Sequence, residues 1–152
     1  MKKVFLLLVL LAIGGCGPKT DFTQKHDFSS GEWSYGEKVD FVFPVDDTEG
    51  QKDLWIEIDH SEGYSYQNLY AKLTTEDPSG NTASQLLSFE LAHKSGQWFG
   101  RCFSGDCHIK ILIKEKVRFE EKGTYKMGLE QFTRKVNLEG IESIRFKVTQ
   151  SL

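Results

Sequence analysis

The chain has 152 residues, with 22 acidic and 19 basic side chains and a formal net charge of −3. This mild acidity argues against the classes of protein that bind nucleic acid through a basic surface. The length suits one domain with a substantial buried core.

The N-terminus has the three zones of a secretory signal. Lys2 and Lys3 form a short basic zone, and residues 4–13 carry no polar side chain. That apolar run is too short for a transmembrane helix, which needs about 20 residues. Residues 13–16, Ile-Gly-Gly-Cys, resemble a lipobox, in which the cysteine is lipidated and the chain is cleaved just before it. We therefore expect a signal peptide over residues 1–15 and lipidation of Cys16; the alternative is an ordinary signal peptide followed by a chance cysteine.

Residues 16–31 follow as the lipidated cysteine and a tether. The segment is polar and lacks hydrophobic periodicity, although it can order against the domain as a lead-in. We expect the folded domain to occupy residues 32–152. Gly17 directly after Cys16 is not the acidic residue that retains lipoproteins at the inner membrane in some bacteria. This favours the outer membrane, and the lack of an acidic cluster in the tether favours its periplasmic face.

The rest of the chain alternates between apolar and polar residues with a period of two, which indicates half-buried strands. Turn-forming residues rich in Gly, Asp and Ser separate the runs. Only residues 130–137 could hold a single helical turn. The alternating segments are 39–45, 54–59, 69–74, 87–92, 109–114, 125–130 and 144–149. We predict an all-β fold, a single antiparallel β-sandwich of about eight to nine strands, closer to a jelly roll than to an immunoglobulin domain.

Two cysteines remain beyond Cys16. Cys102 and Cys107 flank a predicted hairpin turn, which can bring them within disulfide distance. An exported protein meets oxidising surroundings, so a disulfide is the favoured interpretation. Free thiols are the first alternative. A zinc site that includes His108 is the second, but no fourth ligand is apparent.

No catalytic motif accompanies the remaining histidines. His26, His60 and His93 stand alone, and the chain has no nucleophile elbow, phosphate-binding loop or HExxH sequence. We therefore expect neither an enzyme nor a cofactor or metal, and nothing points to nucleic acid or a small-molecule substrate as a ligand.

Several short motifs follow one another in a particular order along the chain. They are Tyr66-x-Asn68-Leu69-Tyr70, Pro78-x-Gly80, Gly96-x-Trp98-x-Gly100, Val117-Arg118-Phe119, Gly123-x-Tyr125, Glu130-Gln131-x-x-Arg134 and Leu138-x-Gly140-Ile141. Together with the lipobox, this order resembles the gliding-motility lipoprotein GldH family of Bacteroidota. The resemblance runs from about residue 26 to the end of the chain. Cys102 and Cys107 are not part of the family pattern, so a disulfide there would be particular to this protein.

The resemblance implies a small envelope lipoprotein without assigned catalytic residues. In gliding species the family is needed for surface motility, which depends on adhesins and on the associated type IX secretion machinery. The family also occurs in species that do not glide. The resemblance therefore implies an accessory component of that machinery, held to a membrane by its lipid and in contact with other envelope proteins.

Aromatic residues offer the only candidate contact surface. Tyr64, Tyr66 and Tyr70 have even spacing, which on one strand would place them in a row on one face. With Trp98 they would form an exposed contact patch, typical of protein or sugar binding. The alternative interpretation is that they are core and edge aromatics. A carbohydrate- or glycan-binding module is accordingly the second functional hypothesis.

Overall fold

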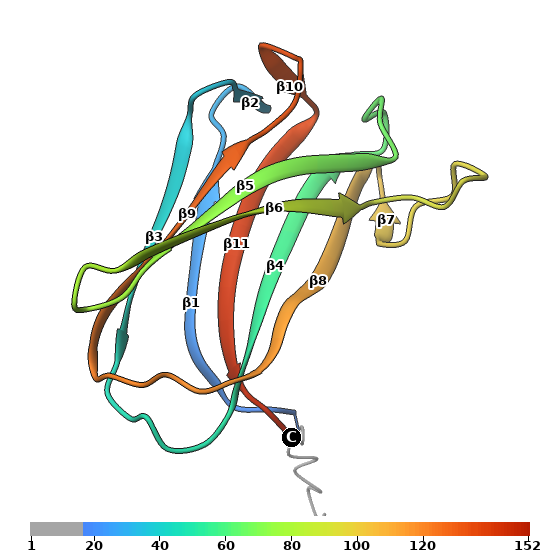
Figure 1. The fold of residues 1–152 in the computed structure, drawn as a ribbon. Helices are drawn as coiled ribbons and strands as arrows, with labels where there is room; N and C mark the ends of the chain where they lie inside the picture. The colour runs from blue at the N-terminus through green and yellow to red at the C-terminus, as the bar shows by residue number, and fades with distance from the viewer. Residues whose placement is uncertain (1–16) are drawn as a thin grey trace, which may run out of the picture.

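The computed structural model describes residues 17–152, and within them every regular element is a β-strand (Figure 1). No helix in this part of the chain has the length and apolar character needed to cross a membrane. The strands are β1 (Thr20–Asp27), β2 (Glu32–Ser34), β3 (Lys38–Val45), β4 (Lys52–Ser61), β5 (Asn68–Glu76), β6 (Thr82–Glu90), β7 (Arg101–Phe103), β8 (Asp106–Val117), β9 (Gly123–Gln131), β10 (Asn137–Glu139) and β11 (Ile141–Gln150).

Two antiparallel sheets form the sandwich. One has the strand order β1-β11-β4-β8-β7, and the other has the order β3-β9-β5-β6. Apart from the β5–β6 hairpin, successive long strands alternate between the two sheets, which is the jelly-roll order. The predicted all-β, jelly-roll-like sandwich is therefore confirmed. A short ribbon of β2 and β10 lies at one end (Figure 1).

The alternation read from the sequence decides which side chains enter the core. In β3, Val39, Phe41, Phe43 and Val45 are buried and the residues between them are exposed. Phe43 meets Phe146 of the opposite sheet with ring centroids 5.2 Å apart. Large aromatic side chains from both sheets thus fill the space between the layers.

The sandwich starts earlier and has more strands than the sequence indicated. Half of the expected tether, Thr20–Asp27, forms β1 and pairs with β11, as an ordered lead-in to the domain. The folded domain therefore does not start at residue 32. Eleven strands replace the predicted eight to nine, the additions being short or at sheet edges. Residues 130–137, where a helical turn was considered, hold the end of β9 at Gln131 and the loop that leads to β10 at Asn137.

The two ends of the sandwich differ in their relation to the chain termini. The start of β1 lies beside the end of β11, where Thr20 pairs with Thr149. We call this the proximal end; it lies at the bottom of Figure 1. The opposite end contains the end of β9 at Gln131 and the start of β11 at Ile141, and we call it the distal end.

Candidate functional site

The expected lipidation residue, Cys16, lies outside the described residues. The described chain starts at Gly17, and strand β1 begins only three residues later. The described chain therefore enters the sandwich at its proximal end.

The predicted tyrosine row does not form on one strand. Strand β5 begins at Asn68, so Tyr64 and Tyr66 lie in the preceding loop. Tyr64 is only 5% exposed, and burial raises the pKa of its hydroxyl well above the ordinary value. Trp98 is half-buried. Only Tyr66 and Tyr70, at 39% and 48% exposure, present large surfaces to solvent.

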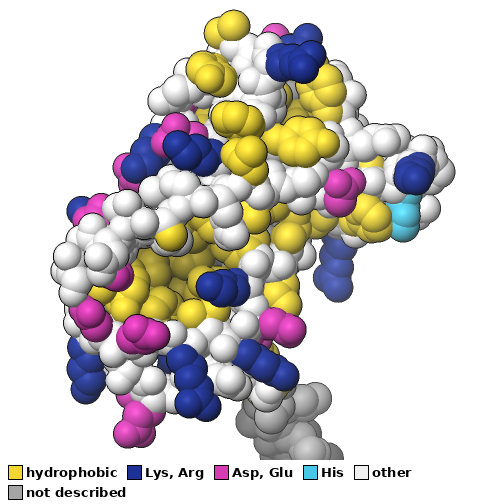
Figure 2. All heavy atoms as spheres, in the orientation of Figure 1, with side chains coloured by type: hydrophobic (Ala, Val, Ile, Leu, Met, Phe, Trp, Pro, Cys, Tyr) yellow, Lys and Arg dark blue, Asp and Glu magenta, His cyan; other side chains and the backbone are white. Residues whose placement is uncertain are grey.

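Tyr70 nevertheless lies within an exposed apolar surface at the distal end. Phe132 adjoins it, because the Phe132 amide donates to the Tyr70 carbonyl at 2.8 Å. Leu86 lies diagonally across the β5–β6 pair on the same face, since Tyr70 pairs with Ser88. Phe132 and Leu86 are 52% and 61% exposed. We call Tyr70, Leu86 and Phe132 the distal patch, and Figure 2 shows apolar side chains gathered on this part of the molecule.

A buried glutamine fixes the loop that carries Phe132. Gln131 is 2% exposed, and its Nε2 donates to the Lys135 carbonyl at 3.0 Å and to two further backbone carbonyls at 3.4 Å. Its Oε1 accepts from the Thr133 hydroxyl at 2.5 Å. The loop between β9 and β10 therefore has a defined conformation. Nothing in its polar sequence marked Gln131 as functional; the only signal was its place in the Glu130-Gln131-x-x-Arg134 motif.

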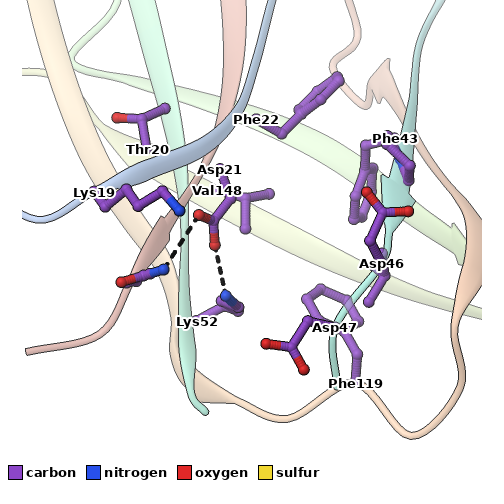
Figure 3. Close-up of a pocket in the computed structure, with 13 residues that line it drawn as sticks. Lys19, Thr20, Asp21, Phe22, Phe43, Asp46, Asp47, Lys52, Phe119 and Val148 are labelled. Carbon is purple, nitrogen blue, oxygen red and sulfur yellow. Dashed lines mark hydrogen bonds and ion pairs between the residues drawn. The ribbon is translucent and has the colours of Figure 1, made fainter. Parts of the chain in front are cut away.

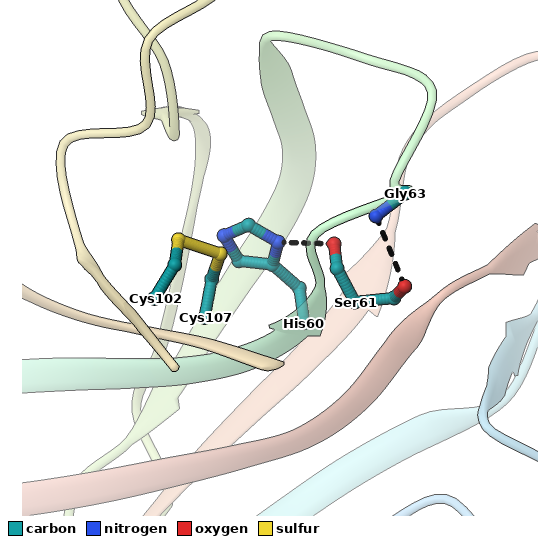
Figure 4. Close-up of a disulfide and its surroundings, with 5 residues drawn as sticks. All are labelled: His60, Ser61, Gly63, Cys102 and Cys107. Atoms are coloured by element: carbon teal, nitrogen blue, oxygen red, sulfur yellow. Dashed lines mark hydrogen bonds between the residues drawn. A yellow bond between two sulfur atoms is a disulfide. The ribbon is translucent and has the colours of Figure 1, made fainter. Parts of the chain in front are cut away.

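Cys102 and Cys107 are joined in a disulfide that closes the β7–β8 hairpin (Figure 4). Because both sulfurs are bonded to each other, no thiolate is left for a zinc ion. Among residues 17–152, no group of three or more His, Cys, Asp or Glu side chains is placed to hold a metal. The arrangement is that of a hairpin closure.

His60 is buried behind this hairpin. It pairs across the β4–β8 ladder with Cys107 and packs against Trp98 with ring centroids 4.6 Å apart. Its Nδ1 lies 2.9 Å from the Ser61 carbonyl and donates to it, which leaves Nε2 as an acceptor (Figure 4). Burial lowers the pKa of His60 below 6.5, so the neutral ring is favoured. His60 thus acts as a core residue that supports Trp98.

An acid, a serine and a histidine meet at Asp59. Its two carboxylate oxygens lie 2.6 Å from the Ser143 hydroxyl and 2.6 Å from His108 Nδ1. Burial opposes ionisation of Asp59, but these hydrogen bonds and the charge of Lys25 outweigh it and lower its pKa. The carboxylate lies between the other two groups, whereas an acyl-transfer triad needs the histidine in the middle. This cluster therefore ties neighbouring strands together and does not activate the serine.

A groove opens between the two sheets in the proximal half of the molecule. Strand β6 is the edge of its sheet, and β7 covers only the first three residues of β8. The two edges do not pair, and the groove between them has a volume of about 440 Å³. Thr75 and Ala83 share the inward face of their strands with the buried Leu73 but are exposed, because the groove is open. Figure 2 shows the hollow with an apolar floor and a charged rim.

A second hollow of about 320 Å³ lies beside it at the proximal end (Figure 3). Asp21 bridges its rim by accepting from Lys52 Nζ at 2.6 Å. Phe43 and Phe119 line both this hollow and the groove. These aromatic side chains therefore form the partition between the two spaces.

Comparisons with known proteins agree with the sequence motifs. The profile of the GldH lipoprotein family matches residues 20–148. The gliding motility lipoprotein GldH homolog of Christiangramia forsetii is 28% identical, over 97% of this chain and 94% of the relative. The gliding motility lipoprotein GldH of Flavobacterium johnsoniae is 29% identical, over 95% of this chain and 94% of the relative.

Similarity to solved structures is weak. A bacteriophage CBA120 tailspike domain covers 86% of this chain, and the chain covers 18% of that domain, at 8% identity. Its TM-score of 0.31 is too low to indicate a shared fold. The family assignment therefore depends on sequence alone, and the profile match spans nearly the whole described domain. The chain belongs to the GldH lipoprotein family.

Proposed function

We propose that the protein is a non-catalytic accessory lipoprotein of the gliding-motility machinery linked to type IX secretion. In this proposal Cys16 carries the lipid, and the domain lies at the periplasmic face of the outer membrane. The names of the relatives, which are gliding motility lipoproteins, support the motility assignment. The lipobox supports the anchor.

The observation that carries the proposal is the distal patch. Tyr70, Leu86 and Phe132 are large apolar side chains that solvent reaches; Tyr70 and Phe132 lie at the distal end, and Leu86 lies at the middle of β6. Tyr70 is oriented by Asn68, whose Nδ2 donates to its hydroxyl at 2.9 Å. An ordered group of exposed aromatic and aliphatic side chains is typical of protein contact surfaces. The proposed partner is another envelope protein that docks on this patch.

The glycan-binding alternative has less support, because stacking on sugars needs open aromatic faces. Trp33 is fully buried, and Lys110 lies over the Trp55 ring with Nζ 3.9 Å from its centroid. Trp98 packs against His60. The tryptophans are therefore covered. Absence of binding to cell-wall and host polysaccharides on a glycan array would end this alternative.

The proposal is tested by affinity purification of the lipidated protein from gently solubilised native membranes, with partners identified by mass spectrometry. We expect motility or secretion components with the wild type and their loss with the Tyr70→Ser/Phe132→Ser double variant. Val42→Ser is the matched control, since Val42 is 48% exposed on the same sheet but on β3. Cys16→Ala tests the anchor separately.

Two outcomes would count against the proposal. If the partners stay bound to the Tyr70→Ser/Phe132→Ser variant, the distal patch is not the contact surface. If no envelope protein is recovered with the wild type, and deletion leaves motility and secretion intact, the accessory role itself is wrong.

A further inference from the structure

The groove between β6 and β8 has an apolar floor without a covering element. Leu54, Ile113 and Phe119 are packed against the core and also line the groove, and the buried Met127 and Phe146 lie at its base. Its volume of about 440 Å³ lies within the range of about 300–1,000 Å³ that is usual for small-molecule sites. Exposed core surface of this kind favours an apolar ligand.

The rim of the groove carries two available cations. Lys126 also lines the groove, but its Nζ is engaged by Glu76 at 2.9 Å. Lys114 and Arg118 form no ion pair with any residue of the described chain, 17–152. Asp77, Glu120 and Glu121 line the same groove, so its rim is mixed in charge. Two unpaired cations among carboxylates beside an apolar cleft suit an acyl chain with a zwitterionic headgroup, whose phosphate Lys114 and Arg118 would meet.

The rim also lies close to the expected anchor. Val117, at the end of β8, pairs with Lys52, and Lys52 Nζ contacts Asp21 at 2.6 Å. Asp21 is five residues after Cys16, and an extended chain of that length spans at most about 18 Å. A lipid on Cys16 would thus hold this end of the groove near the bilayer surface, where phospholipids are the abundant amphiphiles.

The β8 edge is poorly suited to the main competing occupant, a β-strand from another protein. Lysines occupy positions 110, 114 and 116 of this strand, a feature that discourages strand addition. Lys116 has a φ of 53°, and the β4–β8 register shifts near Leu54. The Lys116 amide already donates to Asp53 Oδ1 at 2.9 Å. An added strand would therefore lack a regular row of backbone partners here.

We propose that this groove binds one acyl chain of a membrane phospholipid, with the phosphate held at Lys114 and Arg118. The site deepens the proposed function, because it depends on the anchor at Cys16 to bring the groove to the membrane. The domain would then bind a membrane phospholipid as well as a protein partner.

The test is native mass spectrometry of the full-length lipidated protein in mild detergent, with phosphatidylethanolamine as the probe. We expect a phospholipid mass on the wild type, its loss in Ala83→Trp, which fills the groove, and a reduction in Lys114→Glu/Arg118→Glu. Val42→Trp is the matched control on an outward face and should keep the lipid. If Ala83→Trp does not fold, Thr75→Trp fills the groove from the neighbouring strand.

The two lipids of the protein can be told apart by denaturation. The lipid on Cys16 is covalent and survives unfolding, whereas a phospholipid in the groove is released. If the wild type carries the covalent lipid but no releasable phospholipid, the groove proposal is overturned and the anchor at Cys16 still stands. Phospholipid retained in the groove-filled variants, a fatty acid bound to the wild type in place of phospholipid, or a peptide found there would each overturn the proposal.

Discussion

The clearest single test of the architecture at the distal end is Gln131→Glu. The change is nearly isosteric, yet it replaces the Nε2 amino group, which donates two hydrogens, with a carboxylate oxygen that cannot donate at neutral pH. In the wild type that nitrogen lies 3.0 Å from the Lys135 carbonyl and 3.4 Å from those of Trp33 and Val136. The variant therefore sets a buried charge against three carbonyl oxygens while keeping the volume of the side chain.

The expected loss follows from these contacts. One short hydrogen bond is worth about 1 kcal/mol net, and leaving buried polar groups unpaired adds about 1–3 kcal/mol. We expect the free energy of unfolding to fall by about 2–4 kcal/mol in Gln131→Glu. Urea unfolding followed by tryptophan fluorescence measures this fall. The matched control is Gln24→Glu, which makes the same chemical change at an exposed position of β1.

One result would refute this reasoning. If Gln131→Glu and Gln24→Glu differ by less than about 0.5 kcal/mol, the size of an ordinary surface effect, then the donor bonds do not stabilise the loop. A large loss should also appear as faster hydrogen exchange at the Tyr35 amide, which donates to the Val136 carbonyl at 2.6 Å. That local readout separates loop loosening from general destabilisation.

Three further predictions concern single residues and the disulfide. The pKa of His60 is lower in the folded protein than in the unfolded chain, so the unfolded chain binds more protons, and the free energy of unfolding should fall as the pH drops below 6.5 towards that lowered pKa. His60→Gln should reduce this pH dependence in urea unfolding, whereas the control His93→Gln, at an exposed position, should keep it. Cys102→Ala/Cys107→Ala should lower the free energy of unfolding by about 2 kcal/mol, because the unfolded chain is no longer closed into a loop. Reduction of the disulfide in the wild type should lower the melting temperature as much as the double substitution does; an unchanged melting temperature in both would contradict this. Gly100→Ala should lose about 1–3 kcal/mol in thermal unfolding, because a Cβ there would fall on a backbone carbonyl of β8; wild-type stability would show that the backbone adapts.

The fold could be predicted where strands are buried on one face. Alternation in β3 is complete, and β11 buries Ile144, Phe146 and Val148 in the predicted sense. Strand β1 escaped prediction for a physical reason. It is an edge strand whose pairing with β11 is made by the backbone, and none of its residues is fully buried. A polar sequence can form such a strand without any hydrophobic period.

The candidate sites could not be predicted from the hydrophobic periodicity, because they depend on how strands and loops are arranged in the tertiary structure. Even spacing suggested one strand for the three tyrosines, but a turn in which the Tyr64 amide donates to the Ser61 carbonyl precedes β5 and buries Tyr64. The groove arises because two sheet edges stand apart, which no local pattern encodes. One signal was available: Thr75 and Ala83 are a polar and a small residue at inward positions, where a closed sandwich would place larger apolar side chains.

The motifs that carry the family resemblance divide between the two ends of the domain. Gln131 orders the distal loop, whereas at the proximal end Gly123 lies against Pro78, since an added Cβ would be 2.8 Å from the proline side chain. Arg118 and Phe119, also motif residues, line the groove. The ten residues of β11 separate these ends by about 33 Å at 3.3 Å per residue. None of Tyr70, Leu86 and Phe132 lines the groove, although Leu86 is next to Gln85, which does. The Tyr70→Ser/Phe132→Ser change should therefore leave a phospholipid bound, and Ala83→Trp should leave a protein partner bound.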